Sequence, residues 1–170
     1  MKNEFVIFTG PMFGGKSTLF SAIERYRLKQ KKVYIFKPLQ DTRYDPEGQS
    51  IVNHRGYEMN SVPIVAAEEM YVHLEKRNAT SGVIALDEAF MVDGAAEVLI
   101  DLYKSGYTIL VSSLQLSSSL DPFPEMVKMM PWATRIEVCP AVCTICGADA
   151  FFTYKKGGSH DKVEVGGKEL

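Results

Sequence analysis

The stretch GPMFGGKST at residues 10–18 has the composition and spacing of a phosphate-binding loop. Gly10 is followed by four residues and then by Gly15, Lys16 and Ser17. Glycines allow the backbone to turn so tightly that several N–H groups point at the same phosphate oxygens. Lys16 adds a positive charge, and the hydroxyl group of Ser17 is a suitable Mg²⁺ ligand. We therefore predict that this stretch holds the phosphates of a nucleotide, rather than forming an ordinary glycine-rich turn.

A second group that could take part in a reaction is the acidic pair Asp87 and Glu88, which follows the apolar residues of the stretch VIALDEAF at 83–90. If this run is a strand that ends near the phosphates, one carboxylate of Asp87 and Glu88 can hold Mg²⁺ and the other can take a proton from an attacking hydroxyl group. The alternative is that both acids begin a helix. Together with the loop they indicate use of a nucleoside triphosphate. The residues predicted to bind ATP are Gly10, Pro11, Met12, Phe13, Gly14, Gly15, Lys16, Ser17, Thr18, Asp87, Glu88, Ala89 and Phe90.

The elements that must position these groups follow from the hydrophobic pattern. Continuous apolar runs are typical of strands buried on both faces. They lie at 4–10, 32–38, 62–67, 82–88 and 107–114. Helix-like stretches lie between them, at 16–32, 67–78 and 93–106. Strands that alternate with helices predict an α/β domain with a mainly parallel sheet, whose site lies at the carboxyl ends of the strands.

Two regions depart from this alternation. Residues 40–61 are polar and rich in turn-forming residues, and we expect a loop there. From Cys139 onward, two short strand-like pieces, AFFTY and KVEV, predict a small β-rich module. Within the helix at 93–106, Asp93 suits the first position and Gly106 the end.

Composition limits the possible partners and compartments. The chain has 170 residues, is 46% hydrophobic and has a formal net charge of −2, which suits one sizeable core and gives no general reason to expect a nucleic-acid or membrane partner. No apolar run has the length of a membrane span, and the first residues lack the pattern of a secretion signal. We expect a soluble, cytoplasmic protein.

Further short motifs follow the first two in a fixed order. They are DTRY at 41–44, PF at 122–123, AVCTIC at 141–146 and VEVGG at 163–167. This series resembles the thymidine kinase family whose members carry a zinc-ribbon-like lasso, and the likeness covers nearly the whole chain. It implies a P-loop kinase domain over residues 1–138 and a lasso-like module over 139–170. It also implies a homotetramer that transfers the terminal phosphate of ATP to the 5′-hydroxyl group of thymidine or a related pyrimidine deoxynucleoside.

The resemblance assigns roles to individual residues. Glu88 would be the general base, Lys16 would bind the phosphates, and Arg43 would neutralise charge on the transferring phosphate. The Mg²⁺ ion would be organised by Ser17, Asp41 and Asp87. The nucleoside would be enclosed by Met12, Phe90, Phe123, Thr153 and Val163.

The sequence also departs from the family pattern. Phe90 replaces the glutamine that usually follows the acidic pair, and Ser118 stands where the family has an aromatic residue of the base pocket. The tail has the pair Cys143 and Cys146 but no second pair, whereas a structural zinc ion needs four ligands. Two alternatives are open: zinc bound by this pair together with Cys139 and His160, or a module that binds no zinc. A nucleotide-binding regulatory protein, or a degenerate kinase homologue without activity, is the alternative function.

Overall fold

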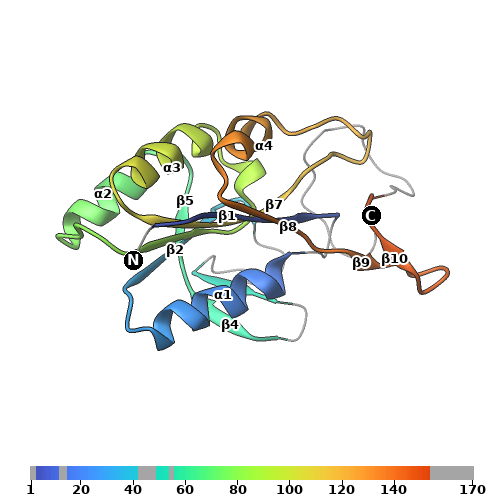
Figure 1. Cartoon of the computed structure of the whole chain (residues 1–170), viewed down its shortest axis with the longest axis horizontal. Coiled ribbons are helices and arrows are strands. Elements are labelled where there is room, and N and C mark those ends of the chain that lie inside the picture. The colour runs from blue at the N-terminus through green and yellow to red at the C-terminus, as the bar shows by residue number, and fades with distance from the viewer. Residues whose placement is uncertain (1–2, 12–14, 42–48, 54–55, 154–170) are drawn as a thin grey trace.

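Six parallel strands form the centre of the fold (Figure 1). The computed structural model describes residues 3–11, 15–41, 49–53 and 56–153. The strands pair in the order β5-β2-β6-β7-β1-β8. Their bounds are β1 (Phe5–Gly10), β2 (Val33–Pro38), β5 (Val62–Ile64), β6 (Val83–Leu86), β7 (Thr108–Leu114) and β8 (Arg135–Val138). The predicted α/β class with a mainly parallel sheet is confirmed.

Helices cover both faces of this sheet (Figure 1). One face carries α1 (Lys16–Leu28). The other carries α2 (Glu69–Lys76), α3 (Ala95–Lys104) and α4 (Pro124–Met129). No helix within the described ranges combines the length and the apolar character needed to cross a membrane.

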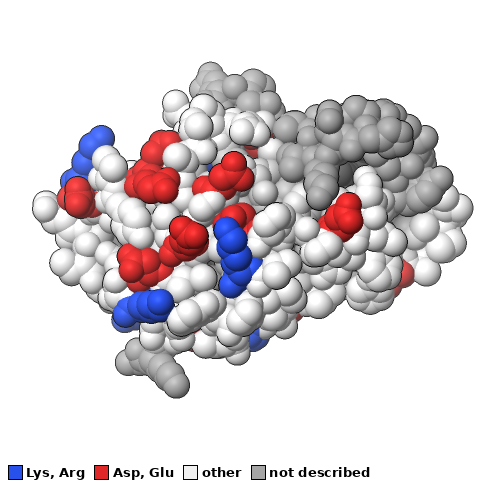
Figure 2. Space-filling model, turned by 90° about the horizontal axis from the view of Figure 1, so that it is seen from above, with Lys and Arg blue, Asp and Glu red and all other residues white. Residues whose placement is uncertain are grey.

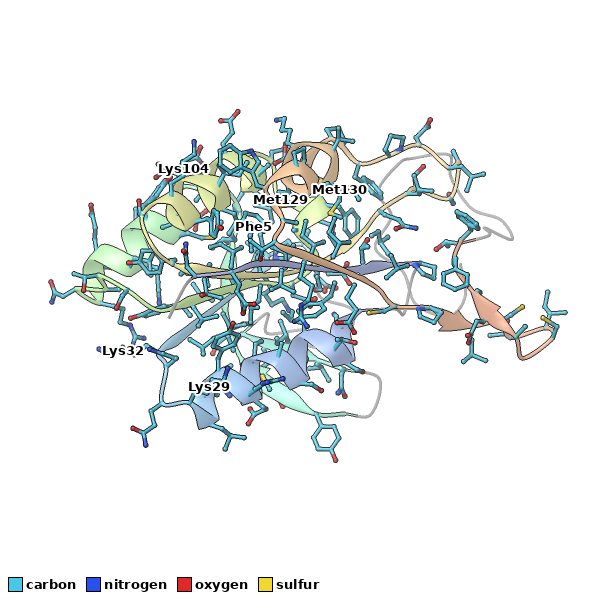
Figure 3. The ribbon with its side chains drawn as sticks, in the orientation of Figure 1. Phe5, Lys29, Lys32, Lys104, Met129 and Met130 are labelled. Atoms are coloured by element: carbon cyan, nitrogen blue, oxygen red, sulfur yellow. The ribbon has the colours of Figure 1, made fainter. Side chains whose placement is uncertain are left out.

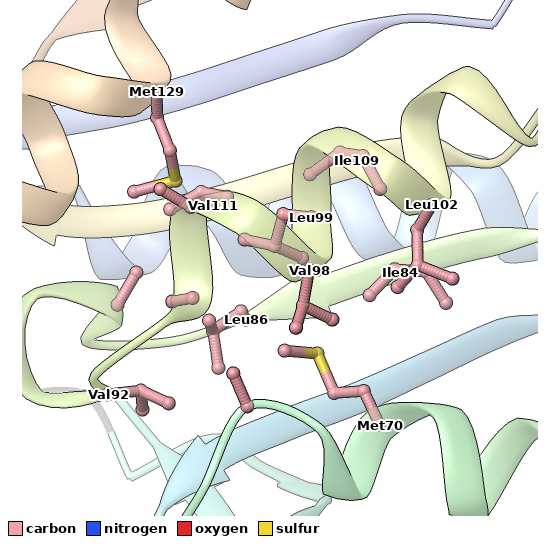
Figure 4. Packing of buried hydrophobic residues seen from close by; sticks show 14 of the residues in the cluster. Met70, Ile84, Leu86, Val92, Val98, Leu99, Leu102, Ile109, Val111 and Met129 are labelled. Atoms are coloured by element: carbon pink, nitrogen blue, oxygen red, sulfur yellow. The ribbon is translucent and has the colours of Figure 1, made fainter.

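The core consists of two clusters, one on each face of the sheet. Phe5 and Ile7 of β1 belong to the cluster under α2, α3 and α4, part of which Figure 4 shows. Val6 and Phe8, which alternate with them, pack with the buried side of α1. Because side chains alternate along a strand, a strand that is covered on both faces of the sheet needs apolar residues on both faces. This explains why the sequence shows continuous apolar runs.

The ends of the predicted elements shift by a few residues. β5 stops at Ile64 rather than residue 67, because the Glu69 carboxylate accepts hydrogen bonds from the N–H groups of Val65 and Ala66, which turns the chain into α2. α3 begins after Gly94 rather than at Asp93. Gly106 does end α3, with a φ of 101° that suits glycine.

The structure also contains elements that the sequence did not predict. The expected loop at 40–61 includes an antiparallel pair, and the strand expected at AFFTY is short, since β10 ends at Ala150. The piece KVEV lies outside the described residues, so the division at residue 139 stays a prediction. β8 and α4 were not predicted. The other elements not yet described are β3 (Ser50–Val52), β4 (Glu58–Asn60), β9 (Ala141–Val142), β10 (Asp149–Ala150) and the 3₁₀ turns η1 (Ala89–Met91) and η2 (Met130–Trp132).

Glu125 of α4 supplies the acidic partner that α3 needs at its amino end. Its side chain is buried, and Oε2 accepts a hydrogen bond of 2.7 Å from the N–H group of Ala96 in the first turn of α3. We expect Glu125→Ala to lower the free energy of unfolding by about 1 to 2 kcal/mol, because that N–H group loses its partner. Urea denaturation measures this change. Glu97→Ala, at an exposed position of the same turn, is the control, and an equal loss in both variants would contradict the role of Glu125.

Candidate active site

The order of the strands brings both ends of the predicted phosphate-binding loop and the acidic pair to the same edge of the sheet. β1 ends at Gly10 and α1 begins at Lys16, while β6 ends just before Asp87. β7 lies between β1 and β6 and pairs with both in parallel. The carboxyl ends of parallel strands meet at one edge, where ligands bind in open α/β sheets. The loop and the acids therefore face the same space across one intervening strand.

Lys16 lies at the centre of this space, among carboxylates. Its Nζ atom is 2.9 Å from Asp87 Oδ2, 3.6 Å from Asp41 Oδ2 and 3.7 Å from Glu88 Oε1. Only 8% of Lys16 is exposed. Burial by itself lowers the pKa of Lys16, but the negative charges of Asp87, Glu88 and Asp41 outweigh it and raise that pKa above its usual value. Lys16 therefore carries its charge at every physiological pH.

Gly10 and Gly15, which stand at the two ends of the predicted loop, lie close to neighbouring backbone atoms. Gly15 precedes α1 with a φ of 81°, and a Cβ atom on it would lie 3.3 Å from the carbonyl oxygen of Phe8. At Gly10 a Cβ atom would lie only 2.2 Å from the carbonyl oxygen of Cys139. The N–H group of Cys139 in turn donates to the carbonyl oxygen of Thr9. Gly10 is therefore required by a close backbone approach, and Gly15 is favoured by its positive φ.

Asp87 is held so that one of its oxygens remains available. It is 1% exposed, and Oδ1 accepts a hydrogen bond from the hydroxyl group of Ser112 on β7. Oδ2 is buried beside Lys16 as an ion pair, but accepts no hydrogen bond of good geometry from the described residues. A buried carboxylate oxygen without a hydrogen bond is costly unless a ligand satisfies it.

The carboxylates suit a divalent cation. Ligand oxygens of Asp41, Asp87 and Glu88 all lie within 4.8 Å of one another. Mg²⁺ prefers such oxygen donors, usually one or two carboxylates together with water and phosphate. Ser17 is exposed in the first turn of α1, where a hydroxyl ligand is available. The oxygen donors of Asp41 and Asp87 therefore suit Mg²⁺, and the assignment of Ser17, Asp41 and Asp87 to this ion stays a prediction.

Glu88 adopts an uncommon backbone conformation. Its φ of 51° and ψ of 46° place it in the left-handed region, which costs a non-glycine residue about 1 to 2 kcal/mol. Its carboxylate group is mostly buried, with 14% of the side chain exposed. Such strain clusters at functional sites, where the surrounding structure holds it. Here the next turn is held by the N–H group of Phe90, which donates to Ser113 Oγ at 3.1 Å.

Sequence reasoning missed the two serines of β7. Ser112 fixes Asp87, and Ser113 fixes the turn after Glu88. Both are buried polar residues at the carboxyl end of an otherwise apolar strand. That pattern was the available signal, because buried hydroxyl groups need partners.

Two aromatic residues predicted to bind the nucleoside meet beside the acidic pair. The ring centroids of Phe90 and Phe123 are 4.6 Å apart, and the ring planes are inclined by 42°. Phe123 is 5% exposed, whereas Phe90 is partly exposed. Ser118 is exposed on a loop that the N–H group of Ser117 closes by donating to the carbonyl oxygen of Asp121. The buried ring of Phe123 thus packs against the partly exposed ring of Phe90.

The remaining predicted residues are placed as follows. Pro11 and Ala89 are buried, and Thr18 and Thr153 are partly exposed. The structure places Asp41, the first residue of the DTRY motif, with its Oδ2 atom 3.6 Å from Lys16 Nζ. Residues outside the described ranges are Met12, Phe13, Gly14, Arg43, His160 and Val163.

The cysteines of the tail have different surroundings. Cys139 lies against α1, with its Sγ atom 3.5 Å from Thr18 Oγ1. Cys143 and Cys146 flank the turn between β9 and β10. In the described part of the chain, no group of three or more His, Cys, Asp or Glu ligands forms around them. Zinc binding by Cys143 and Cys146 therefore stays a prediction.

Comparison with known protein families gives one result for this chain. The family model described as thymidine kinase matches residues 3–170. The match spans the sheet, the acidic pair, the β9–β10 hairpin and the tail.

Proposed function

The chain belongs to the thymidine kinase family, and from this premise we propose that it transfers the γ-phosphate of ATP to the 5′-hydroxyl group of thymidine or a related pyrimidine deoxynucleoside. The observation that carries the proposal is the cluster of Lys16 with Asp41, Asp87 and Glu88 at the carboxyl edge of the sheet. Phosphoryl transfer needs positioning and charge stabilisation more than covalent chemistry, and this cluster is suited to both.

Lys16 is the residue that attracts the triphosphate. Without nucleotide its charge is balanced by the surrounding carboxylates, so it is held in place before ATP arrives. Phosphate oxygens compete with these carboxylates for the same ammonium group. The backbone N–H groups at the start of α1 add the favourable end of the helix dipole.

Glu88 is the residue that takes the proton. In the proposed reaction the 5′-oxygen forms a bond to the γ-phosphorus atom, and the bond from that atom to the bridging oxygen of ADP breaks. The proton of the 5′-hydroxyl group moves to the Glu88 carboxylate. Asp87 is less suited to this role, because its Oδ1 atom accepts the hydrogen bond from Ser112 and its Oδ2 atom is the one proposed to bind Mg²⁺.

Ser17, Asp41 and Asp87 are the residues that would hold Mg²⁺. When bound, the ion neutralises negative charge on the phosphate oxygens. The buried Oδ2 atom of Asp87 supports this assignment, because it accepts no hydrogen bond of good geometry from the described residues.

Phe90 and Phe123 are proposed to form one wall of the nucleoside site. An aromatic ring favours stacking with a flat pyrimidine base. Phe90 carries the exposed surface for such contact, and the buried Phe123 ring fixes its position.

A panel of pyrimidine nucleosides tests the proposed activity. We expect labelled phosphate from ATP to appear on at least one pyrimidine deoxynucleoside, and thymidine is the first choice because of the family. Thin-layer or liquid chromatography measures the labelled monophosphate. The matching nucleoside that lacks a 5′-hydroxyl group is the control and should remain unlabelled. If every member of the panel remains unlabelled, while ATP still binds, the non-enzymatic alternative would replace this proposal.

A further inference from the structure

A cavity of about 560 Å³ opens at the other end of the sheet, near the start of β2. It lies between the last turn of α1 and the last turn of α2, beside residues 60–62. Figure 3 shows Lys32, one of its lining residues, at the end of the molecule away from the β9–β10 hairpin. The catalytic residues lie at the carboxyl ends of the strands, so this cavity is distinct from the active site.

The cavity exists because β5 covers only part of β2. β5 pairs with β2 from Phe36 to Pro38, whereas β6 pairs with β2 from Val33 to Phe36. On the outer edge of β2, residues 33–35 therefore have no strand beside them within the described chain. The chain before Val62 diverges from β2 at this point and leaves a notch in the edge of the sheet.

The charges around the notch are positive. Arg27, Lys32 and Arg77 line the cavity, and none of the described residues that line it is acidic. Arg27 is held by Glu24 at 3.1 Å, whereas neither Lys32 nor Arg77 has an ion-pair partner among the described residues. Burial lowers the pKa of His73, and the nearby charges of Arg77 and Lys76 lower it further. A hollow lined by one sign of charge attracts ions of the opposite sign.

The positive charge around the notch contrasts with the charge of the rest of the molecule. The chain as a whole has a formal net charge of −2. Figure 2 shows acidic side chains gathered over the face that carries α2, α3 and α4. An anion is therefore repelled from that face and attracted to the notch.

The lining also offers a hydrogen-bonding group and two rings. The Oγ atom of Ser61 is buried and has no hydrogen-bond partner among the described residues. Tyr34 and His73 stand edge to face, with ring centroids 6.4 Å apart. A hydroxyl group without a partner is a site for an acceptor oxygen, and an aromatic pair is a surface for the organic part of a ligand.

We propose that this cavity is a second ligand site, which binds a small organic phosphate. Lys32 and Arg77 contact the phosphate oxygens, Ser61 donates a hydrogen bond to one of them, and Tyr34 and His73 contact the organic group. The volume lies within the range of about 300 to 1,000 Å³ that is usual for small-molecule sites. Arginine and lysine are the side chains that proteins use most for phosphate.

Titration calorimetry with inorganic pyrophosphate and with ADP tests this site. The Lys16→Ala variant is used as the background, because it weakens binding at the active site. In that background we expect measurable binding of both probes, with ADP the tighter because only ADP has an organic ring. Adding Arg77→Glu should weaken both by about tenfold or more, since a charged hydrogen bond is lost and a repulsive charge is gained. Equal affinity for both probes would overturn the role of the rings.

Arg25→Glu in the same background is the matched control. Arg25 is an exposed cation of α1 that lines a different cavity, and the charge change is identical. Binding that survives Arg77→Glu unchanged, or that falls equally with Arg25→Glu, would overturn the site. Hydrogen exchange on the unmodified protein gives a second measurement that needs no variant. Pyrophosphate should slow exchange at residues 60–62 and 73–77, and slowing confined to residues 10–18 would contradict the proposal.

Discussion

Replacing Glu88 with glutamine is expected to reduce the rate of phosphate transfer by about 10² to 10⁴-fold, the usual contribution of a general base. Glutamine keeps the length and the hydrogen-bonding shape of the side chain but cannot accept the proton of the 5′-hydroxyl group. Its backbone can also adopt the left-handed conformation that Glu88 has, at a similar cost. The fold and the affinity for ATP should therefore remain close to those of the unmodified protein.

Single-turnover kinetics with labelled ATP measures the rate of transfer, and equilibrium binding of ATP measures the affinity. Glu68→Gln makes the same chemical change at an exposed position before α2, and it should leave both quantities unchanged. Glu88→Asp retains the carboxylate but shortens its reach, so an intermediate rate is expected. An unchanged rate in Glu88→Gln would assign the proton transfer to another group.

Replacing Lys16 with alanine is expected to lower both ATP binding and phosphate transfer. A hydrogen bond to a charged group contributes about 1.5 to 3 kcal/mol, which corresponds to roughly 10- to 150-fold in either quantity. The variant should also be less stable. Removing Lys16 takes away the ammonium group that lies 2.9 Å from the buried carboxylate of Asp87, and breaking a buried ion pair in this way typically costs about 3 to 5 kcal/mol.

Magnesium provides a specific readout of this charge balance. In Lys16→Ala, Mg²⁺ can take the position of the missing ammonium group among the carboxylates. Without nucleotide, Mg²⁺ should therefore raise the melting temperature of Lys16→Ala more than that of the unmodified protein. Lys29→Ala, at the exposed end of α1, is the control and should behave like the unmodified protein. An equal effect of Mg²⁺ on all three proteins would show that Lys16 does not balance these carboxylates.

The sequence by itself predicted the groups that are proposed to carry the chemistry. The spacing of Gly10, Gly15 and Lys16 predicts a phosphate-binding loop because the requirement is local, namely a tight turn followed by a helix. The acidic pair after β6 was recognised for the same reason, since it directly follows an apolar strand. The continuous apolar runs likewise predicted the strands of the sheet, because burial on both faces allows no polar alternation.

Elements with weak local patterns were not predicted. β8 is an edge strand with mostly exposed side chains, and α4 has only six residues, so neither has a clear hydrophobic period. The short pair of β3 and β4 lies in a polar segment. β8 depends on pairing with β1, and α4 on its contact with α3, which are both far away in the chain.

Only the tertiary structure decided how the site is assembled. It placed β7 between β1 and β6, so that Ser112 reaches Asp87, and it brought Phe123 against Phe90. It also surrounded Lys16 with three carboxylates from two separate segments of the chain, Asp41 and the pair Asp87 and Glu88. Spacing along a sequence specifies turns and the faces of helices and strands, because these depend on near neighbours. The order of strands in a sheet depends on packing between distant segments, and the partners of a buried charge are set by that order.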